Sequence, residues 1–277
     1  MIALIDADIV AYRCAATVHD YEDPEIAFYR VDVLMTQILE ATSAKEYVAY
    51  LTGKDNFRKK INPEYKANRK DMVPPVYLQE CKAHIQKNWN TDIKSIYEAD
   101  DLLGMNQTSE SIICSIDKDL LMIPGEHFNW VKMEFQSVTK QDGLRHFYKQ
   151  MLIGDRSDNI TGVAGIGQVK ATKIIDPLDT EQDMFEAVFA RYDNPSRFIM
   201  NANCLWILQQ EGQPWTNRQD LTLENQFAQE VAQTSDYMTL LMAGTLMEPT
   251  TMKNETSGIL SNGTSMDTMQ TNDQPST

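Results

Sequence analysis

The sequence has few of the side chains that bind soft metals or form disulfide bridges. Its 277 residues include four cysteines and four histidines. The cysteines, at positions 14, 81, 114 and 204, are far apart and form no C-x-x-C pair. Each is therefore expected to be a small buried side chain rather than a zinc ligand or a disulfide partner, which fits a reducing cytoplasm.

Long apolar runs are also missing. No stretch approaches the roughly 18 consecutive apolar residues that a membrane-spanning helix needs. The first residues, Met1 to Asp6, lack the basic start and the cleavage site of a secretory signal and are typical of a buried strand. We expect a cytoplasmic protein with no membrane partner.

Positive charge is scarce overall, and the formal net charge is −15. Because nucleic-acid binding depends on Lys and Arg, this total argues against such a partner. The distribution argues the other way, since the segment from Lys54 to Lys87 holds nine basic and four acidic residues. A locally positive segment can hold a phosphate backbone, although a charge run taken alone is more often a solvated surface.

Apolar runs suited to strands alternate along the chain with segments suited to helices. Strands are predicted at 2–5, 47–51, 92–97 and 111–116, and helices at about 7–18, 24–41 and 140–153. This alternation predicts an α/β fold with a mainly parallel central sheet flanked by helices. The region 180–245 is predicted to be largely helical. The polar composition of 248–277 predicts a disordered tail.

Acidic residues recur where the predicted strands end and the predicted helices begin. They form four groups: Asp6 with Asp8; Glu98, Asp100 and Asp101; Asp117 and Asp119; and Asp155 and Asp158. Asp155 and Asp158 are three residues apart, so on a helix they would share one face. Ligands of parallel sheets lie beyond the carboxyl ends of the strands, so we expect the groups to meet in one cleft. Taken singly, each acid is equally well explained as a helix cap or a solvated turn.

Carboxylates gathered in one cleft repel each other unless cations neutralise them. Their hard oxygen atoms select Mg²⁺ or Mn²⁺ over zinc, and no His or Cys cluster offers an alternative. Two such ions, about 3.5–4 Å apart, can activate water and stabilise the leaving oxygen in phosphodiester hydrolysis. The acids therefore predict a two-metal site for phosphodiester chemistry.

Two further motifs suit a phosphate backbone. Lys66 and Arg69 can hold a scissile phosphate, and the neighbouring Tyr65 can stack on a terminal base. The other interpretation is a surface helix whose Lys and Arg side chains extend along the protein surface with their charged ends in water. The second motif is a glycine-rich turn that opens a helix and lets backbone N–H groups approach an anion. Its residues are Gly162, Gly165 and Gly167, followed by Lys170 and Lys173.

Taken together, these residues resemble the 5′ nucleases, and most closely their bacteriophage exonuclease/flap endonuclease branch. The matching strings, in the family's order between residue 2 and about 175, are LIDAD, PEYKANR, EADD, SIDKD, GDRSDN and GVAGIGQVKA. Beyond that point the resemblance is loose.

The resemblance implies a PIN-like catalytic core at 1–153 with a helical arch at about 55–90. It also implies a helix-3-turn-helix region for duplex DNA at 154–247. Lys66 and Arg69 match the family's catalytic basic pair, and Tyr65 its stacking aromatic. The implied metal ligands are Asp6, Glu98, Asp100, Asp101, Asp117, Asp119, Asp155 and Asp158. The segment from Gly162 to Lys170 corresponds to the hairpin that holds duplex DNA, where the family often binds a potassium ion.

The predicted function is that of a metal-dependent 5′-3′ exonuclease or 5′ flap endonuclease that uses two Mg²⁺ ions, with Mn²⁺ as a substitute. The expected partners are DNA with 5′ ends, flaps or nicks, and RNA primers paired with DNA. We expect a monomer that acts in phage DNA replication, recombination or host-DNA breakdown.

One position departs from the family's pattern. After the second predicted strand the family usually has another Asp, and here Gly53 stands there. Either Asp55, two residues further on, supplies the missing carboxylate, or this part of the metal site has fewer acidic ligands. Asp8 either joins the acidic cluster or caps the first helix.

Three other interpretations compete with a 5′ nuclease. The string Ile5 to Val10 fits the D-x-D-x-[TV] signature of haloacid-dehalogenase-type phosphatases, but that family has no place for both EADD and SIDKD. A non-catalytic DNA-binding relative of the same fold would gain nothing from so many repelling carboxylates. A PIN-type ribonuclease would share the acidic sheet but lack the glycine-rich hairpin.

Overall fold

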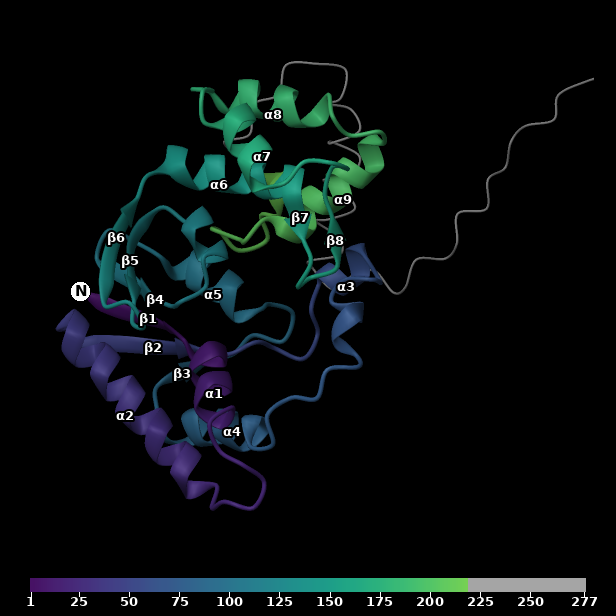
Figure 1. The fold of residues 1–277 in the computed structure, drawn as a ribbon. Helices are drawn as coiled ribbons and strands as arrows, with labels where there is room; N and C mark the ends of the chain where they lie inside the picture. Colours follow the sequence, from purple (N-terminus) through teal and green to yellow (C-terminus); the bar gives the residue numbers. More distant parts are fainter. Residues whose placement is uncertain (219–277) are drawn as a thin grey trace, which may run out of the picture. The chain divides into compact units, whose positions relative to one another are not determined.

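The structure, a computed structural model, describes residues 1–218 (Figure 1). The chain divides into Met1–Leu246 and Met247–Thr277, and all the described residues belong to the first unit. The tail predicted at 248–277 and the last part of the predicted helical region lie outside the described residues.

The helices and strands follow the predicted alternation. The strands are β1 (Ile2–Asp6), β2 (Glu46–Tyr50), β3 (Thr91–Asp92), β4 (Ser111–Cys114), β5 (Gly125–Asn129), β6 (Glu134–Val138), β7 (Gly154–Asp155) and β8 (Ile160–Thr161). The α-helices are α1 (Ala7–Ala15), α2 (Glu25–Thr42), α3 (Arg58–Ile61), α4 (Leu78–Asn88), α5 (Ala99–Asn106), α6 (Lys140–Ile153), α7 (Gln168–Ile175), α8 (Glu181–Phe189) and α9 (Pro195–Leu205). Three short 3₁₀ helices are η1 (Ala67–Arg69), η2 (Asp119–Met122) and η3 (Trp215–Asn217).

The central sheet has six strands in the order β3-β2-β1-β4-β5-β6. All neighbours are parallel except β5 and β6, which confirms the predicted, mainly parallel sheet. The chain continues from β1 to β2 on one side, and later reaches β4 on the other side of β1. In such sheets a crevice opens outside the carboxyl ends of the two strands where the order reverses. Asp6 ends β1 at that position.

Each face of the sheet has its own core, because successive side chains of a strand point to opposite faces. Leu4 and Ile113 pack into a cluster shared with α5, α6 and α9. Ala3 and Ile112 pack into a second cluster under α1, α2 and α4. Figure 1 shows α2 and α4 together on one side of the sheet, and α5 and α6 on the other.

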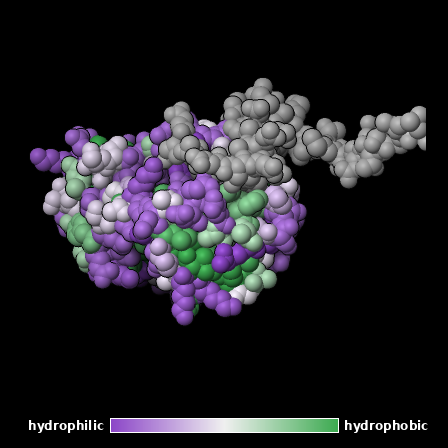
Figure 2. All heavy atoms as spheres, turned by 90° about the horizontal axis from the view of Figure 1, so that it is seen from above, coloured by the Kyte–Doolittle hydropathy of each residue, from purple (hydrophilic) through white to green (hydrophobic). Residues whose placement is uncertain are grey.

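The helices after α6 continue the first of these cores. Trp215 is fully buried, and its ring centroid lies 5.5 Å from that of Phe198 and 6.3 Å from those of Phe147 and Phe185. One hydrophobic cluster therefore runs through both of the predicted domains, 1–153 and 154–247, as far as they are described. The face above α6 to α8 is largely hydrophilic, with one apolar patch near its edge (Figure 2).

The sequence-based prediction was wrong at two strands. The strand predicted at 92–97 ends at Asp92, because the backbone groups that follow bond to the loop after β2 instead of the sheet. The N–H groups of Gly53, Asp55 and Phe57 donate to the carbonyls of Tyr97, Ser95 and Ile96, at 2.8–3.2 Å. The β5–β6 hairpin was not predicted, since four of the five residues of β6 are exposed and lack an apolar alternation.

Other expectations agree with the structure. All four cysteines are buried and free of disulfide bonds. Within residues 1–218, no helix is both long enough and apolar enough to span a bilayer.

Candidate active site

A cleft of about 540 Å³ opens at the carboxyl ends of β1 and β4. Charged side chains of both signs line it. The acids are Asp6, Asp8, Glu98, Asp100, Asp117, Asp119 and Asp158, and the bases are Lys54, Lys59, Lys66, Arg69, Lys70 and Lys82. The acids that the sequence predicted to meet do so for the most part, and the exceptions are Asp101 and Asp155.

Asp6 lies at the bottom of the cleft and is 1% exposed. One carboxylate oxygen caps α1 by accepting from the backbone N–H of Ile9 at 3.2 Å. The other accepts from the Ser115 hydroxyl at 2.7 Å. Burial, reinforced by the Asp8 carboxylate, raises the pKa of Asp6 to about 7. Near neutral pH the Asp6 carboxyl group therefore exists in both the protonated and the ionised form, and a bound cation would favour the ionised form.

Asp100 and Asp117 reach the same cleft from the start of α5 and from the loop after β4. Burial raises the pKa of Asp100 well above its usual range, and Asp6 and Asp117 raise it further. Burial also raises the pKa of Asp117, with Asp119 adding to the effect. The Asp117 carboxylate accepts from the backbone N–H of Asp119 at 2.9 Å, and its own N–H donates to the Ser115 hydroxyl at 3.0 Å. For both acids, burial and the neighbouring carboxylates together outweigh the groups that lower the pKa.

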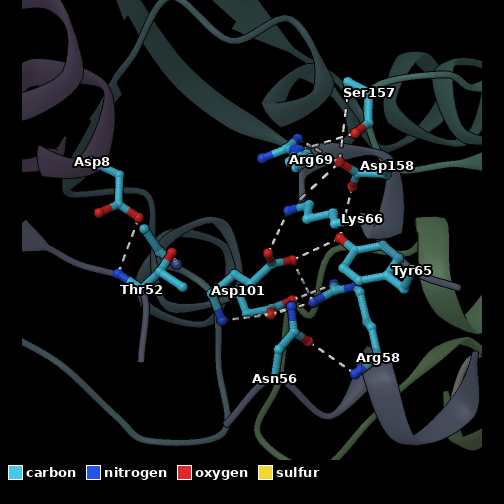
Figure 3. A network of polar contacts seen from close by, with 12 residues as sticks. Asp8, Thr52, Asn56, Arg58, Tyr65, Lys66, Arg69, Asp101, Ser157 and Asp158 are labelled. Carbon is cyan, nitrogen blue, oxygen red and sulfur yellow. Dashed lines mark hydrogen bonds and ion pairs between the residues drawn. The ribbon is translucent and has the colours of Figure 1, made fainter. Parts of the chain in front are cut away.

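Glu98 and Asp158, in contrast, are held by cationic and hydroxyl groups. Figure 3 shows Tyr65, Lys66 and Arg69 beside Asp158. The Lys66 ammonium donates to Glu98 and lies 3.6 Å from Asp158. Arg69 donates to Asp158 at 2.7 Å. Burial opposes ionisation of Glu98, but Lys66 and Arg58 outweigh it and lower the pKa of Glu98 to about 2. Burial still raises the pKa of Asp158, as it does for Asp6, Asp100 and Asp117, so among these acids only Glu98 has its pKa lowered by neighbouring cations.

Lys66 is fixed through its backbone as well as its side chain. It has a left-handed conformation, with φ 57° and ψ 19°, which is uncommon for a residue with a side chain. Its N–H donates to the carbonyl of Asp158 at 2.9 Å. Asn68 and Arg69 donate to the carbonyls of Arg156 and Ser157 at 2.7 and 3.0 Å. The segment 66–69 is therefore docked on the loop 156–158.

The predicted arch at 55–90 consists of α3, η1, a loop and α4. Met72, Val73 and Val76 in the loop are 64%, 92% and 55% exposed. Lys82 of α4 pairs with Asp8 at 2.7 Å, so the far end of the loop is fixed to α1. Whether the loop closes over a substrate stays a prediction.

The structure does not bring Asp101 to the cleft, although the sequence predicted a metal ligand there. Its side chain is fully buried, and both oxygens accept from Arg58, at 2.6 and 2.7 Å. Adjacent residues on a helix point about 100° apart, so Asp100 and Asp101 cannot both face the same cleft. Asp101 instead caps α5 by accepting from the backbone N–H of Glu98.

Tyr65 was predicted to stack on a base, and the structure contradicts this. Its ring is 3% exposed, so no base can reach its face. Its hydroxyl lies 2.8 Å from a Glu98 oxygen and 2.7 Å from an Asp158 oxygen. Burial raises the pKa of Tyr65 well above its usual range, so the hydroxyl keeps its proton. Tyr65 orients two carboxylates rather than a base.

Asp155 and Asp158 do not share a helical face, since Asp155 ends β7 and Asp158 lies in the turn between β7 and β8. Asp155 accepts from the N–H and the hydroxyl of Ser157, both at 2.7 Å, and does not line the cleft. It still lies near enough to Asp117 to help raise the pKa of that residue. Asp119 lines the cleft from the start of η2.

The open questions on Asp8 and Asp55 have clear answers in the geometry. Asp8 lines the cleft, accepts from the backbone N–H of Thr52 at 3.1 Å and pairs with Lys82, while α1 is capped by Asp6. Figure 3 shows the Asp8–Thr52 contact apart from the Lys66 network. Asp55 is exposed and accepts from the Ser95 hydroxyl at 2.7 Å. It does not line the cleft, so it does not replace the family's acid.

Gly53 has no room for a side chain. A Cβ atom there would lie 2.2 Å from the carbonyl oxygen of Lys94 and 2.4 Å from that of Ser95. The loop 93–97 is bonded to the loop 53–57, so these carbonyls are held in place. An aspartate at this position would need a different path of the 93–97 loop.

We expect Gly53→Ser to lower the free energy of unfolding by about 1–3 kcal/mol, the usual cost of overpacking. Gly167→Ser is the matched control, because a Cβ at Gly167 meets nothing within 4 Å and serine is a good N-cap for α7. Urea unfolding of both variants measures the difference. Equal stability of the two would mean that the 93–97 loop moves aside freely.

The glycine-rich turn lies outside the cleft. Gly162 is packed against Leu152 to Gly154, where a Cβ would lie 2.3 Å from the Ile153 carbonyl carbon. Gly165 has φ +74°, and Gly167 leads into α7, so no N-cap side chain accepts from the first N–H groups of that helix. Lys170 is exposed and donates to the carbonyl of Gly165 at 2.8 Å. Lys173 is exposed one turn further on.

Several residues of the site escaped the sequence-based prediction. Arg58 is one of nine basic residues in its segment, and no pattern marks it as the buried one. Ser115 connects Asp6 to the backbone of Asp117, and its place as the first residue of SIDKD, directly after the apolar run, was the available signal. Lys54, Lys59, Lys70 and Lys82 line the cleft and were predicted only as part of the basic segment.

The donor set fits a divalent ion in chemistry and charge. Asp6, Asp100 and Asp117 supply hard oxygen atoms, and their raised pKa values mark a deficit of positive charge. Within residues 1–218, no three acidic, His or Cys side chains already converge closely enough to hold one ion.

Comparisons with known proteins point to one family. The model of the family described as "5′-3′ exonuclease, N-terminal resolvase-like domain" matches residues 1–150. The chain is 27% identical over 225 residues to a 5′-3′ exonuclease of Buchnera aphidicola subsp. Schizaphis graminum, a match that covers 73% of this chain and 78% of the relative. It is 28% identical over 206 residues to the flap endonuclease Xni of Shewanella oneidensis, covering 67% and 78%.

A solved structure shares the fold. The structure of T5 5′-exonuclease with bound divalent zinc ions matches with a TM-score of 0.59 and 16% identity, over 88% of this chain and 98% of the T5 chain. At this identity the likeness concerns the fold alone.

Proposed function

The chain belongs to the 5′-3′ exonuclease family and is a hydrolase of DNA phosphodiester bonds; from this premise we propose that it cuts DNA at or near 5′ ends with the help of divalent ions. The observation that carries the proposal is the cleft at β1 and β4, where acids with raised pKa values face Lys66 and Arg69.

In this proposal Asp6, Asp100 and Asp117 hold the ions, with Asp119 and Asp155 beside them. Mg²⁺ is the expected ion and Mn²⁺ the expected substitute, as in other carboxylate sites. When bound, two such ions would supply water activation and neutralise charge on the leaving oxygen. Glu98 and Asp158 stay in the ligand set, but in the structure their oxygens are engaged by Lys66, Arg69 and Tyr65.

Lys66 and Arg69 act on the scissile phosphate. Burial opposes protonation of Lys66, but Glu98 and Asp158 outweigh it and raise the pKa, so the side chain remains an ammonium. A phosphate that enters the cleft offers anionic oxygens in place of those carboxylates. Both cations can then donate to its non-bridging oxygens and stabilise the charge that develops there. Lys54, Lys59 and Lys70 continue the positive lining for the rest of the strand.

The glycine-rich turn is proposed to hold the duplex. The free N–H groups at the start of α7, together with Lys170 and Lys173, suit the backbone of one strand. A potassium ion at this turn would need to replace the Lys170 ammonium at the Gly165 carbonyl. The protein is proposed to act as a monomer on flaps, nicks and RNA–DNA hybrids.

The phosphatase alternative does not survive the family assignment. Its nucleophile would be Asp6, which is buried and accepts hydrogen bonds on both oxygens. A non-catalytic DNA-binding relative is disfavoured because Lys66 is held beside the acids in position for chemistry.

A 5′-flapped duplex, labelled at either end, tests the proposal with Mg²⁺, with Mn²⁺ and with EDTA. We expect release of a short flap in the presence of either ion and none in EDTA. A ladder of mononucleotides would favour the exonuclease activity over the flap endonuclease activity. Tight binding of the flapped duplex without any cleavage would contradict the proposal and leave a DNA-binding protein.

A further inference from the structure

Arg58 is a fully engaged, buried cation outside the cleft lining. Its residue is 2% exposed. The guanidinium donates to both oxygens of Asp101 at 2.6 and 2.7 Å, and to the backbone carbonyls of Cys204 and Trp206 at 2.9 and 2.8 Å. A fifth contact reaches Glu98 at 3.3 Å. A bidentate pair of this kind has a defined geometry and orients both partners.

Asp101 adds backbone contacts to the segments that Arg58 reaches. Besides Arg58 it accepts from the backbone N–H of Glu98 at 3.2 Å and from that of Leu208 at 3.1 Å. The ion pair therefore connects three parts of the chain that are distant in sequence. These are the basic segment before Lys66, the start of α5, and residues 204–208 at the end of α9 and just beyond it.

Glu98 is the point where this network meets the cleft. One of its oxygens receives Arg58 and the Tyr65 hydroxyl, and the other receives Lys66. Arg58, which does not line the cleft, thus helps to orient the Glu98 carboxylate. That carboxylate in turn holds the ammonium of Lys66. A shift of Arg58 moves Glu98 and, through it, Lys66.

We propose that Arg58 and Asp101 are positioning residues for the reaction: they fix Glu98, and thereby Lys66, and they tie the position of Lys66 to the chain segment 204–208. This inference rests on the proposed role of Lys66 at the scissile phosphate. The positioning role requires Asp101 to be buried. A role as a metal ligand would require the same side chain to be exposed to the cleft.

The test is a double-mutant cycle in single-turnover cleavage of a 5′-flapped duplex at saturating Mg²⁺. Arg58→Lys keeps the charge but loses the bidentate geometry, and we expect it to lower the cleavage rate by about 10–100-fold, as expected for a misplacement of the order of 1 Å. The KM for the duplex is expected to change little. In a Lys66→Met background, Arg58→Lys is expected to change the rate less than about twofold, because the group that it positions is gone.

Glu181→Gln is the matched control, since Glu181 pairs with the buried Arg218 away from the cleft. It is expected to lower the unfolding temperature while leaving the cleavage rate of the folded protein unchanged. If Arg58→Lys does not fold, Asp101→Asn takes its place in the double-mutant cycle. It keeps the shape of the side chain and removes the negative charge that pairs with Arg58.

The possible outcomes distinguish a failure of the positioning role of Arg58 from a failure of the proposed role of Lys66. A folded Arg58→Lys protein with the wild-type rate would overturn the positioning role alone. An equal loss of rate in both backgrounds would also overturn it, because the two residues would then act independently. A wild-type rate for Lys66→Met would refute the proposed role of Lys66, and the inference with it.

Discussion

Asp117→Asn is expected to lower the single-turnover rate of cleavage by about 10³-fold, while the affinity for a flapped duplex stays within about twofold. Metal ions supply several kcal/mol of charge stabilisation in such reactions, and about 4 kcal/mol corresponds to a factor of 10³. The amide keeps the oxygen that accepts from the Asp119 N–H at 2.9 Å, so the loop after β4 keeps its shape. What is lost is a negative charge that a divalent ion needs.

The measurement compares cleavage rates in Mg²⁺ with duplex affinity in Ca²⁺ or EDTA. Asp55→Asn is the matched control, because Asp55 is an acid close in sequence to the cleft that is turned to Ser95 instead. It is expected to cleave at the wild-type rate. Normal turnover by Asp117→Asn would remove Asp117 from the metal site, and a parallel loss of affinity would mean that the substitution disturbs the DNA-binding surface.

In the absence of divalent ions, the stability of the protein is expected to fall as the pH rises from about 5 to 8. The pKa of Asp6 is about 7 in the folded protein and about 4 when the chain is unfolded, and those of Asp100 and Asp117 are raised as well. The folded state therefore binds more protons than the unfolded state in this range, and stability is lost as these acids ionise. For Asp6 alone the loss between pH 5 and 8 is of the order of 3 kcal/mol, which corresponds to about two pH units at about 1.4 kcal/mol each.

Two other groups act in the opposite sense. The pKa of Glu98 is about 2, so its contribution is present above its unfolded pKa and is lost only in strong acid. Burial lowers the pKa of His127, which favours the folded state as the pH rises through the unfolded value near 6.5. Glu98 and His127 are present in the wild type and in a variant of Asp6. Their contributions therefore cancel when the free energy of unfolding of the variant is subtracted from that of the wild type at each pH.

Urea unfolding at pH 5, 6, 7 and 8, in EDTA and in Mg²⁺, measures this linkage. Asp6→Asn is expected to flatten the decline in EDTA, and Mg²⁺ to restore stability to the wild type at pH 8 but less to the variant. A wild-type stability in EDTA that is constant from pH 5 to 8 would show that the buried acids are compensated without a metal.

The part of the site that the sequence predicted depends on short-range rules. A strand that ends in an acid, as Ile2–Asp6 does, places that acid at the carboxyl edge of a parallel sheet whatever the rest of the chain does. The same rule located Asp117, and the N-terminal position of Asp100 on α5 located the third acid. These expectations needed only the direction of the strands and the start of a helix.

The part that the sequence did not predict depends on pairing between distant segments. Asp101 follows Asp100 directly, and only the arrival of Arg58 from 43 residues away decides that it is buried. Tyr65 looks like a surface aromatic until Glu98 and Asp158 enclose its hydroxyl. Gly53 looked like a missing ligand, while its actual reason is the path of the 93–97 loop.

The basic segment divides at Lys70 into a fixed part and an exposed part, and this division bears on how such proteins diversify. Residues 58–69 are held by Arg58, Lys66 and Asn68, whereas Met72, Val73 and Val76 of the loop that follows are exposed. The chain is anchored again where the Tyr77 hydroxyl donates to the carbonyls of Asp20 and Glu22 and where Lys82 pairs with Asp8. Insertions or deletions between the two anchors would alter which strands can pass over the cleft without moving Lys66 or Arg69. Substrate range and bond cleavage can therefore evolve separately in this architecture.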